Sequence, residues 1–292
     1  MLLEEFAQKP TINIDFHNHG QTGSEFRKKQ KGFANKLWSL LLSEGYSNLT
    51  NVLDKVRRSR VDILYLTNFS ESRFEDWTSE EQIKRAEKAG YQIEVGEYYV
   101  FAKKNGKVIA LGKSQEVFTK QGHVLLAGLK REKKISDGKS LDETLKEAND
   151  KELKIADHAF CKIKGQHGIL AYSTKREEDT NKADALEENG NFYFPVSTAN
   201  YKARKYSKMY NKPLLCDSDG HHPKDIGRTY NRFKSEYLSY NSERDFRDSI
   251  NKAVKQNKFT GIYSPIPPYR IFHHAMMIFI NKLRDKIYHR KR

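Results

Sequence analysis

Side chains of the kinds that bind metal ions recur along this chain beside short apolar segments. Five of the seven lie within or next to runs that read as buried β-strands. The ends of parallel strands meet at one mouth when the strands close into a barrel, so these side chains would gather there. Imidazole and carboxylate groups together suit divalent transition metals. The seven are His17, His19, Glu97, His123, His158, Asp219 and His221.

Strand and helix signals alternate along the chain, which indicates βα units and a largely parallel sheet. Asn105-Gly106 predicts a hairpin between strands at residues 91–101 and 108–111. Ser140 and Glu143 have the spacing of a capping box and predict the start of a helix. Seven strand candidates with intervening helices fit a closed barrel better than an open sheet. We therefore predict an α/β fold, a distorted (β/α)7 barrel with a helical extension at its C-terminus.

The two-residue period of a β-strand tells which candidate ligands share a face. In the first predicted strand and its continuation, Asp15, His17 and His19 point to the same side. Glu97 follows Gly96 on a predicted strand, where a buried carboxylate would be costly unless it met a cation.

The segment 214–222 predicts a second shared face near the end of the chain. If its extended conformation continues past the strand, Asp217, Asp219 and His221 lie on one side. His123 opens one apolar strand and His158 follows another, and each alone is more typical of a structural histidine. Only the whole series favours a metal site.

Composition limits the class of protein. The 292 residues carry a net charge of +15, with 53 Lys and Arg against 38 Asp and Glu, so the surface should attract polyanions such as nucleic acid. A solvated lysine-rich surface explains the same numbers.

Two cysteines without a CxxC pair support neither a disulfide framework nor a thiolate zinc site, and a reducing cytoplasm is the expected location. No apolar run approaches the roughly 20 residues that cross a bilayer.

These segments, taken in order, resemble the PHP family, named for polymerase and histidinol phosphatase. The resemblance covers residues 11–228. The matching segments are His17-Asn18-His19, Val95-Gly96-Glu97, the strand that begins at His123, Ala156-Asp157-His158-Ala159-Phe160, and Cys216-Asp217-Ser218-Asp219-Gly220-His221-His222-Pro223. One motif departs from the family: Thr67-Asn68-Phe69 stands where the family usually has Thr-Asp-His, and an early acid of the family is at best Glu25.

The resemblance implies two divalent transition metal ions, of manganese, iron or zinc, and a third site that is lost or weak. His17, His19, Glu97 and Asp219 would hold one ion. Glu97, His123 and His158 would hold the other, with Glu97 bridging. His221 would then be a weak third ligand or, with Asp219, a catalytic group beside the leaving oxygen.

The resemblance also implies a metal-dependent phosphoesterase, and the basic balance favours nucleic acid or a nucleotide as its substrate. Two alternatives remain open: a phosphatase for small phosphate monoesters, and a non-catalytic module that binds nucleic acid or protein. Cations that follow the ligand segments are candidate phosphate contacts, although in a lysine-rich chain each is more typical of plain surface. They are Lys130, Arg131, Lys162, Lys164 and Arg228.

The end of the chain forms a separate segment. We predict a phosphoesterase barrel over residues 1–263, followed by a proline-rich linker and a basic amphipathic helical tail over residues 264–292. The tail has an apolar stripe that could pack on the barrel, lie on an anionic membrane or dock onto a partner protein. Aromatic and basic residues around Tyr201, Arg204 and Lys205 could likewise stack bases, or could simply pack in the core.

Overall fold

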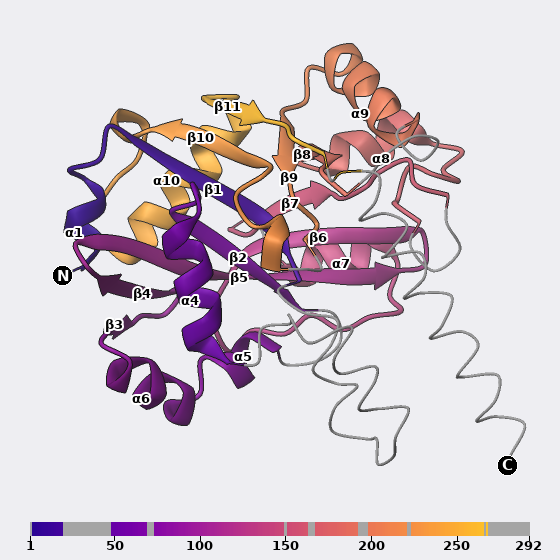
Figure 1. Ribbon diagram of the computed structural model, residues 1–292. Helices are drawn as coiled ribbons and strands as arrows, with labels where there is room; N and C mark the ends of the chain where they lie inside the picture. Colours follow the sequence, from indigo (N-terminus) through magenta and orange to yellow (C-terminus); the bar gives the residue numbers. More distant parts are fainter. Residues whose placement is uncertain are drawn as a thin grey trace, which may run out of the picture.

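The computed structural model describes residues 2–19, 48–68, 73–148, 151–162, 167–191, 198–220, 223–265 and 267. Figure 1 shows one twisted sheet with helices outside it. Most of the predicted tail lies outside the described residues.

Eleven strands of the described chain form this sheet. The main path runs β11-β10-β1-β2-β5-β6-β7-β8-β9, and β3 and β4 branch from β5. The strands are β1 (Thr11–Asn18), β2 (Ile63–Asn68), β3 (Gln92–Val95), β4 (Tyr99–Lys104), β5 (Lys107–Thr119), β6 (Gly122–Leu129), β7 (Leu153–Ala156), β8 (Ala185–Asn189), β9 (Leu214–Asp217), β10 (Tyr230–Lys234) and β11 (Phe259–Ile262). The α/β barrel class is confirmed, and the sheet has more strands than the seven predicted.

The sheet curls until β1 and β9 nearly meet. Asn18 and Gly220 form a parallel bridge there, and His19 N–H donates to the Gly220 carbonyl at 3.0 Å. Lower in the seam, the Asp217 carboxylate accepts the Phe16 N–H at 2.9 Å. The seam is therefore closed by side chains as well as by backbone, and the end of β1 lies beside the end of β9.

The long strand β5 links the two parts of the sheet. Its first half pairs with β4 through the hairpin at Asn105-Gly106, where both residues have positive φ, as the sequence predicted. Its second half pairs with β6 after a register shift between Lys113 and Ser114. The strand predicted at residues 108–111 thus continues to Thr119. Because β6 runs antiparallel, its first residues lie at the same edge as the last residues of β5.

The described helices cover the outside of the sheet (Figure 1). At α7 the capping box predicted from Ser140 and Glu143 is confirmed, with Ser140 N–H donating to the Glu143 carboxylate at 2.8 Å. No described helix is long and apolar enough to cross a membrane. The helices are α1 (Leu2–Phe6), α4 (Leu49–Arg58), α5 (Arg73–Trp77), α6 (Glu80–Lys88), α7 (Leu141–Ala148), α8 (Arg176–Lys182), α9 (Thr198–Met209) and α10 (Glu243–Lys255), with short 3-10 turns η1 (Pro223–Asp225) and η2 (Ser235–Tyr237).

Aromatic side chains pack in the barrel interior next to the histidines of β1. Phe16 stacks on Tyr65 with ring centroids 5.1 Å apart, and the Tyr65 and Tyr99 hydroxyls are hydrogen-bonded at 2.6 Å. A Cβ atom at Gly112 would come within 2.7 Å of the Tyr65 ring, so only glycine fits there. This packing fixes β5 against β2 four residues before Glu116.

Candidate metal centre

His17 and His19 lie together at the end of β1. Their Nε2 atoms are 3.0 Å apart, and both side chains are buried. The shared face predicted from strand alternation therefore holds. Two ring nitrogens that converge on one point suit a cation between them and an acidic partner. The partner is Asp219, whose Oδ1 lies 3.3 Å from His19 Nε2 and 3.5 Å from His17 Nε2.

Glu116 on β5 joins this group to a second one. Its Oε2 lies 3.2 Å from His19 Nε2, whereas its Oε1 lies 3.0 Å from His158 Nε2 and contacts His123 Nδ1. One buried carboxylate thus faces imidazoles on both sides. Two sets of ligand atoms result, each within 4.8 Å: His17, His19 and Asp219 in one, and Glu116, His123, Asp157 and His158 in the other.

The topology explains why these residues meet. β1, β2, β5, β7, β8 and β9 all run in the same direction, and β6 runs against them. His19, His158 and Asp219 follow the carboxyl ends of β1, β7 and β9, while His123 is the second residue of β6. All therefore lie at one edge of the barrel.

Glu187 on β8 fixes the orientation of the first histidine. Its Oε1 is 2.7 Å from His17 Nδ1, and its Oε2 accepts the His158 N–H at 2.6 Å. An ionised carboxylate only accepts, so His17 Nδ1 donates to Glu187 and Nε2 is the ring nitrogen that faces the centre. Asn189 donates to Glu187 Oε2 at 3.1 Å and to Asp219 Oδ2 at 2.9 Å, which leaves Asp219 Oδ1 facing the histidines.

The electrostatics of the cluster favour positive charge at its centre. Burial alone would raise the pKa of Glu116, but hydrogen bonds from four imidazoles hold that pKa well below its usual range. Burial likewise acts to lower the pKa of His17, yet the carboxylates of Glu187 and Asp219 raise it well above the ordinary value. Burial raises the pKa of Asp157. The carboxylates of the cluster therefore favour positive charge at its centre, which divalent cations would supply.

Two of these residues have strained backbone. His158 has φ of +29° and Asp219 has φ of +44°, in the left-handed region that non-glycine residues rarely adopt. The turn at Asp219 ends the extended conformation of β9. As a result Asp217 does not share a face with Asp219, as residues 214–222 had suggested, but turns into the seam toward Phe16 and Asn231.

Glu97 is not part of this centre, which corrects the prediction that it bridges two ions. It lies in the exposed turn between β3 and β4, where its side chain is 42% exposed and paired with Lys130. The Glu97 N–H donates to Glu243 at 2.7 Å, which anchors the turn to α10. Gly96 therefore forms part of a turn, and Glu116 instead lies between the two groups of imidazoles.

Sequence reasoning missed Glu116 because the predicted strand ended at Leu111. The polar segment from Gly112 to Gln115 reads as a loop, yet β2 and β6 pair with β5 throughout it. Glu116 lies opposite Leu125, and His123 is therefore its diagonal neighbour across the strand pair. Asp157 and Glu187 were also missed as members of the centre.

The altered family motif has a structural role here. The Asn68 side-chain oxygen Oδ1 accepts the Phe74 N–H at 2.8 Å, and its Nδ2 donates to Glu75 at 3.0 Å, so Asn68 binds the first turn of α5. Phe69 and His221 lie outside the described residues, and so does Glu25.

The predicted phosphate contacts are mostly engaged elsewhere. Lys130 pairs with Glu97, Arg131 donates to the Thr78 carbonyl, and Arg228 donates to the Pro265 carbonyl. Lys162 is exposed and lies over the Tyr172 ring. Lys164 lies outside the described residues.

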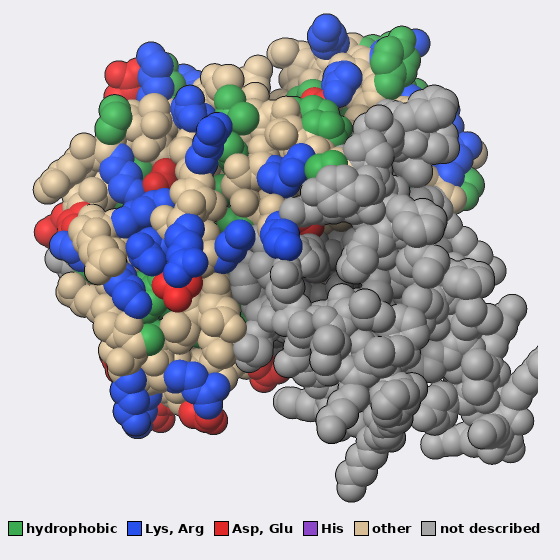
Figure 2. All heavy atoms as spheres, viewed as in Figure 1, with side chains coloured by type: hydrophobic (Ala, Val, Ile, Leu, Met, Phe, Trp, Pro, Cys, Tyr) green, Lys and Arg blue, Asp and Glu red, His purple; other side chains and the backbone are tan. Residues whose placement is uncertain are grey.

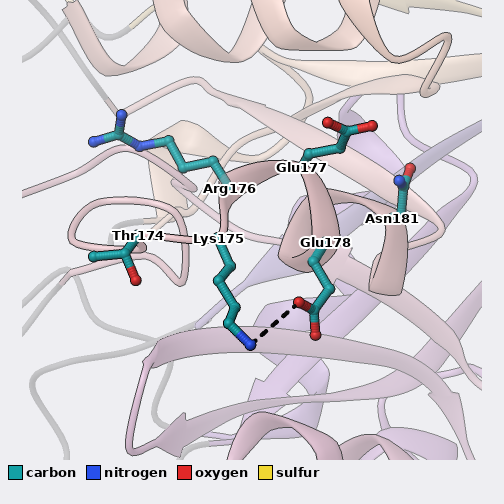
Figure 3. Close-up of a pocket in the computed structure, with 6 residues that line it drawn as sticks. All are labelled: Thr174, Lys175, Arg176, Glu177, Glu178 and Asn181. Carbon is teal, nitrogen blue, oxygen red and sulfur yellow. Dashed lines mark ion pairs between the residues drawn. The ribbon is translucent and has the colours of Figure 1, made fainter.

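A shallow hollow of about 500 Å³ lies at the start of α8 (Figure 3). Lys175 and Glu178 form an ion pair of 3.6 Å across it, while Arg176 points away from that pair. No member of the metal-ligand sets lines this hollow. Its lining residues are Thr174, Lys175, Arg176, Glu177, Glu178 and Asn181.

The donor set fits divalent metal ions. Each set combines imidazole nitrogens with carboxylate oxygens, and His123 Nε2 is buried with no hydrogen-bond partner in the described chain. Buried polar atoms usually have partners, so a buried imidazole nitrogen without one suits a ligand position. Mixed nitrogen and oxygen donors suit manganese, iron or zinc alike.

Comparison with known proteins shows what the chain and its fold are similar to. Residues 197–254 match the family model described as PHP-associated. The fold is similar to that of PsfC from Pseudomonas syringae PB-5123, with TM-score 0.55 and 14% identity over 96% of this chain and 100% of that one. A search of curated proteins finds no significant match.

Two longer proteins are also similar in fold. Endonuclease Q, in complex with a 27-mer duplex substrate with an abasic lesion at the active site, has TM-score 0.50 and 15% identity over 84% of this chain and 57% of that chain. A two-domain protein from Bacteroides vulgatus ATCC 8482, containing a predicted PHP-like metal-dependent phosphoesterase, has TM-score 0.49 and 17% identity over 87% and 65%. This chain thus spans less than two thirds of either protein.

The matched PHP-associated segment begins just before α9, includes β9 with Asp219, and ends within α10. This match covers one part of the chain, and the order of the motifs and the barrel are likewise similar to those of the PHP family.

Proposed function

We propose that this protein is a metal-dependent phosphoesterase. The observation that carries the proposal is Glu116, a buried carboxylate whose two oxygens face separate groups of imidazoles. Such a bridge holds two ions a few ångströms apart, as in two-metal phosphoesterases. A single structural metal would need only one of the two groups.

Some residues of the centre would bind the ions, and others would orient those ligands. One ion would be bound by His17, His19 and Asp219, and the second by His123, His158 and Asp157. Glu116 would bind both ions. The ions supply Lewis acidity toward the phosphoryl oxygens and an activated water. Glu187 and Asn189 hold the first group in position. His221, with Asp219, remains the proposed catalytic group nearest the leaving oxygen.

A direct test combines metal content with turnover. Protein purified without chelator should contain close to two divalent ions per chain, and it should hydrolyse a phosphodiester. Removal of metal by EDTA should abolish hydrolysis, and manganese or zinc should restore it. Two tightly bound ions without turnover on diesters, monoesters or oligonucleotides would favour the non-catalytic module instead.

A basic face favours a polynucleotide over a small monoester. We define the basic wall as Arg58, Arg60, Lys224 and Arg232, all of them exposed. In Figure 2 Lys and Arg side chains gather over α4 and the strands beside it, with few Asp or Glu among them. A polyanion needs such an extended surface, whereas a small monoester needs only the metal centre.

Hydrogen bonds and packing join the parts of this wall. Asn13 donates to the Arg60 carbonyl at 2.7 Å and accepts from Arg232 at 3.1 Å. Gly227 lies so close to α4 that a Cβ there would be 2.8 Å from Ser59 Cβ. Asn13 lies four residues before His17 on β1, which is about 13 Å along a strand. Arg60 and Arg232 therefore lie beside β1 at this distance from His17, whereas Lys224 is five residues after Asp219 in the chain.

Three arginines of the wall, Arg58, Arg60 and Arg232, form no ion pair with any carboxylate of the described residues, unlike the cations of other basic surfaces. On α6, Lys84 pairs with Glu80 and Arg85 with Glu81. Near the wall, the carboxylate of Asp62 is already bound by Lys9 at 2.7 Å. Endonuclease Q, which shares the fold, was solved with a duplex substrate, and this also supports nucleic acid as the substrate class.

Replacing Arg58, Arg60 and Arg232 with glutamine should weaken oligonucleotide binding and make it less dependent on salt. Each phosphate contact that is lost should reduce the slope of log Kd against log salt concentration by about 0.7–0.9. The loss of three contacts should therefore reduce this slope by about 2. Fluorescence anisotropy at several salt concentrations measures this slope.

The matched control replaces Lys88, Lys146 and Lys252, which are exposed on α6, α7 and α10. If the salt dependence of binding decreased equally in both triple variants, net charge alone would explain the binding. The basic wall would then have no specific role in it.

A further inference from the structure

Tyr172 is an exposed aromatic residue beside the metal centre. Its relative exposure is 59%, which is high for a large apolar side chain in this fold. Its hydroxyl donates to the Lys162 carbonyl at 3.1 Å, so the ring is held in position although it is not buried. The exposed face of this ring is therefore open to a ligand.

Ring contacts connect Tyr172 to a proposed metal ligand. The Tyr172 and His167 centroids are 5.6 Å apart, and the His167 and His123 centroids are 6.1 Å apart. The Tyr172 ring is therefore no more than about 12 Å from the His123 ring. The His123 N–H also donates to the His167 carbonyl at 2.9 Å, which ties this segment to the start of β6.

A cation accompanies the ring. Lys162 Nζ lies 5.5 Å from the Tyr172 centroid, and Lys162 is exposed. An aromatic ring with an adjacent cation is the combination that binds a nucleobase by stacking and its phosphate by charge. Because the Tyr172 ring is at most about 12 Å from the His123 ring, a nucleotide with its phosphate at the metal centre could place its base at this ring.

We infer that Tyr172, with Lys162 beside it, stacks a nucleobase of the substrate next to the phosphate held at the metal centre. The inference rests on the proposed function and narrows its substrate to nucleotides or single-stranded nucleic acid. Tyr172 is in this account a binding residue, which acts on substrate affinity rather than on the chemical step.

Binding of two oligonucleotides of equal length and charge tests the inference. One carries bases, and the other is an abasic chain with the same phosphodiester backbone. In anisotropy titrations, Y172A should bind the base-containing oligonucleotide about 5- to 150-fold more weakly, the range expected for one lost stacking contact. Its affinity for the abasic chain should stay unchanged, and Y172F should bind both like the wild type.

The matched control is Y237A. Tyr237 on η2 is also exposed and also has a lysine over its ring, with Lys258 Nζ 5.1 Å from the centroid. This variant should bind both oligonucleotides like the wild type. The inference is overturned if Y172A loses no affinity, or loses it equally for both chains.

The two proposals fail differently. Binding is measured without turnover, so the stacking site can be tested in a protein that has no activity. If the protein hydrolyses no phosphoester but Y172A shows the base-dependent loss of affinity, the phosphoesterase proposal is wrong and the stacking site stands. A protein that hydrolyses diesters and shows no base-dependent loss refutes only the stacking site.

Discussion

Replacing Glu116 with glutamine is expected to release bound metal and to lower kcat by more than about 100-fold, since even residues that only support metal ligands contribute 10- to 100-fold. The physical reason is that Glu116 contacts both groups of imidazoles, so the change removes a negative charge shared by two ions. Elemental analysis of the purified variant and its rate on a phosphodiester measure both effects.

Glu97 provides the matched control for this experiment. It is the glutamate that the sequence favoured as the bridge, but it is exposed and paired with Lys130. E97Q should therefore keep the metal content and the rate of the wild type. If E97Q lost metal and E116Q kept it, the assignment of the bridge would be wrong.

Replacing Glu187 with glutamine is expected to weaken metal binding by about 10- to 100-fold while the fold persists. Both Glu187 oxygens accept hydrogen bonds, from His17 Nδ1 and from the His158 N–H. The NH2 group of glutamine would face either the His17 Nδ1–H or the His158 N–H, and two donors cannot form a hydrogen bond. His17 would then lose the acceptor that fixes its tautomer. Competition with a metal chelator measures the affinity.

The control for this variant is E188Q, one residue along β8. Glu188 faces the other way and pairs with Arg204 of α9. E188Q should lower the melting temperature without changing metal affinity. Equal losses of affinity in both variants would mean that any disturbance of β8 loosens the centre, and that Glu187 has no orienting role of its own.

The pairing with Glu188 also settles one idea from the sequence. Arg204 was a candidate for tracking a nucleic-acid backbone, together with Lys205 and Tyr201. In the structure Arg204 binds a buried carboxylate and lies over the Tyr263 ring, so it packs α9 onto β8. Lys205 and Tyr201 are exposed.

Features set by local chemistry could be predicted from the sequence. The hairpin at Asn105-Gly106 follows from residues that tolerate positive φ, and the shared face of His17 and His19 follows from strand geometry. The start of β6 beside His123 follows from the apolar run behind it. Each of these features depends on residues that are close together in the sequence.

Features set by tertiary contacts could not be predicted. β5 continues through a polar segment because β2 and β6 pair with it on both sides, and this carries Glu116 to the centre. Strand β8 has the sequence ALEEN, which lacks an apolar run, yet all five residues are buried between β7 and β9. Glu97 matched a family motif, but the carboxylate of Glu243 holds its backbone in a turn.

Anomalous diffraction from crystals of the protein with manganese or zinc tests the central claim most directly. The account predicts two peaks about 3.5–4 Å apart, on either side of the Glu116 carboxylate. One should lie among His17, His19 and Asp219, and the other among His123, His158 and Asp157. A single peak, or a peak at Glu97 with none at Glu116, would contradict it.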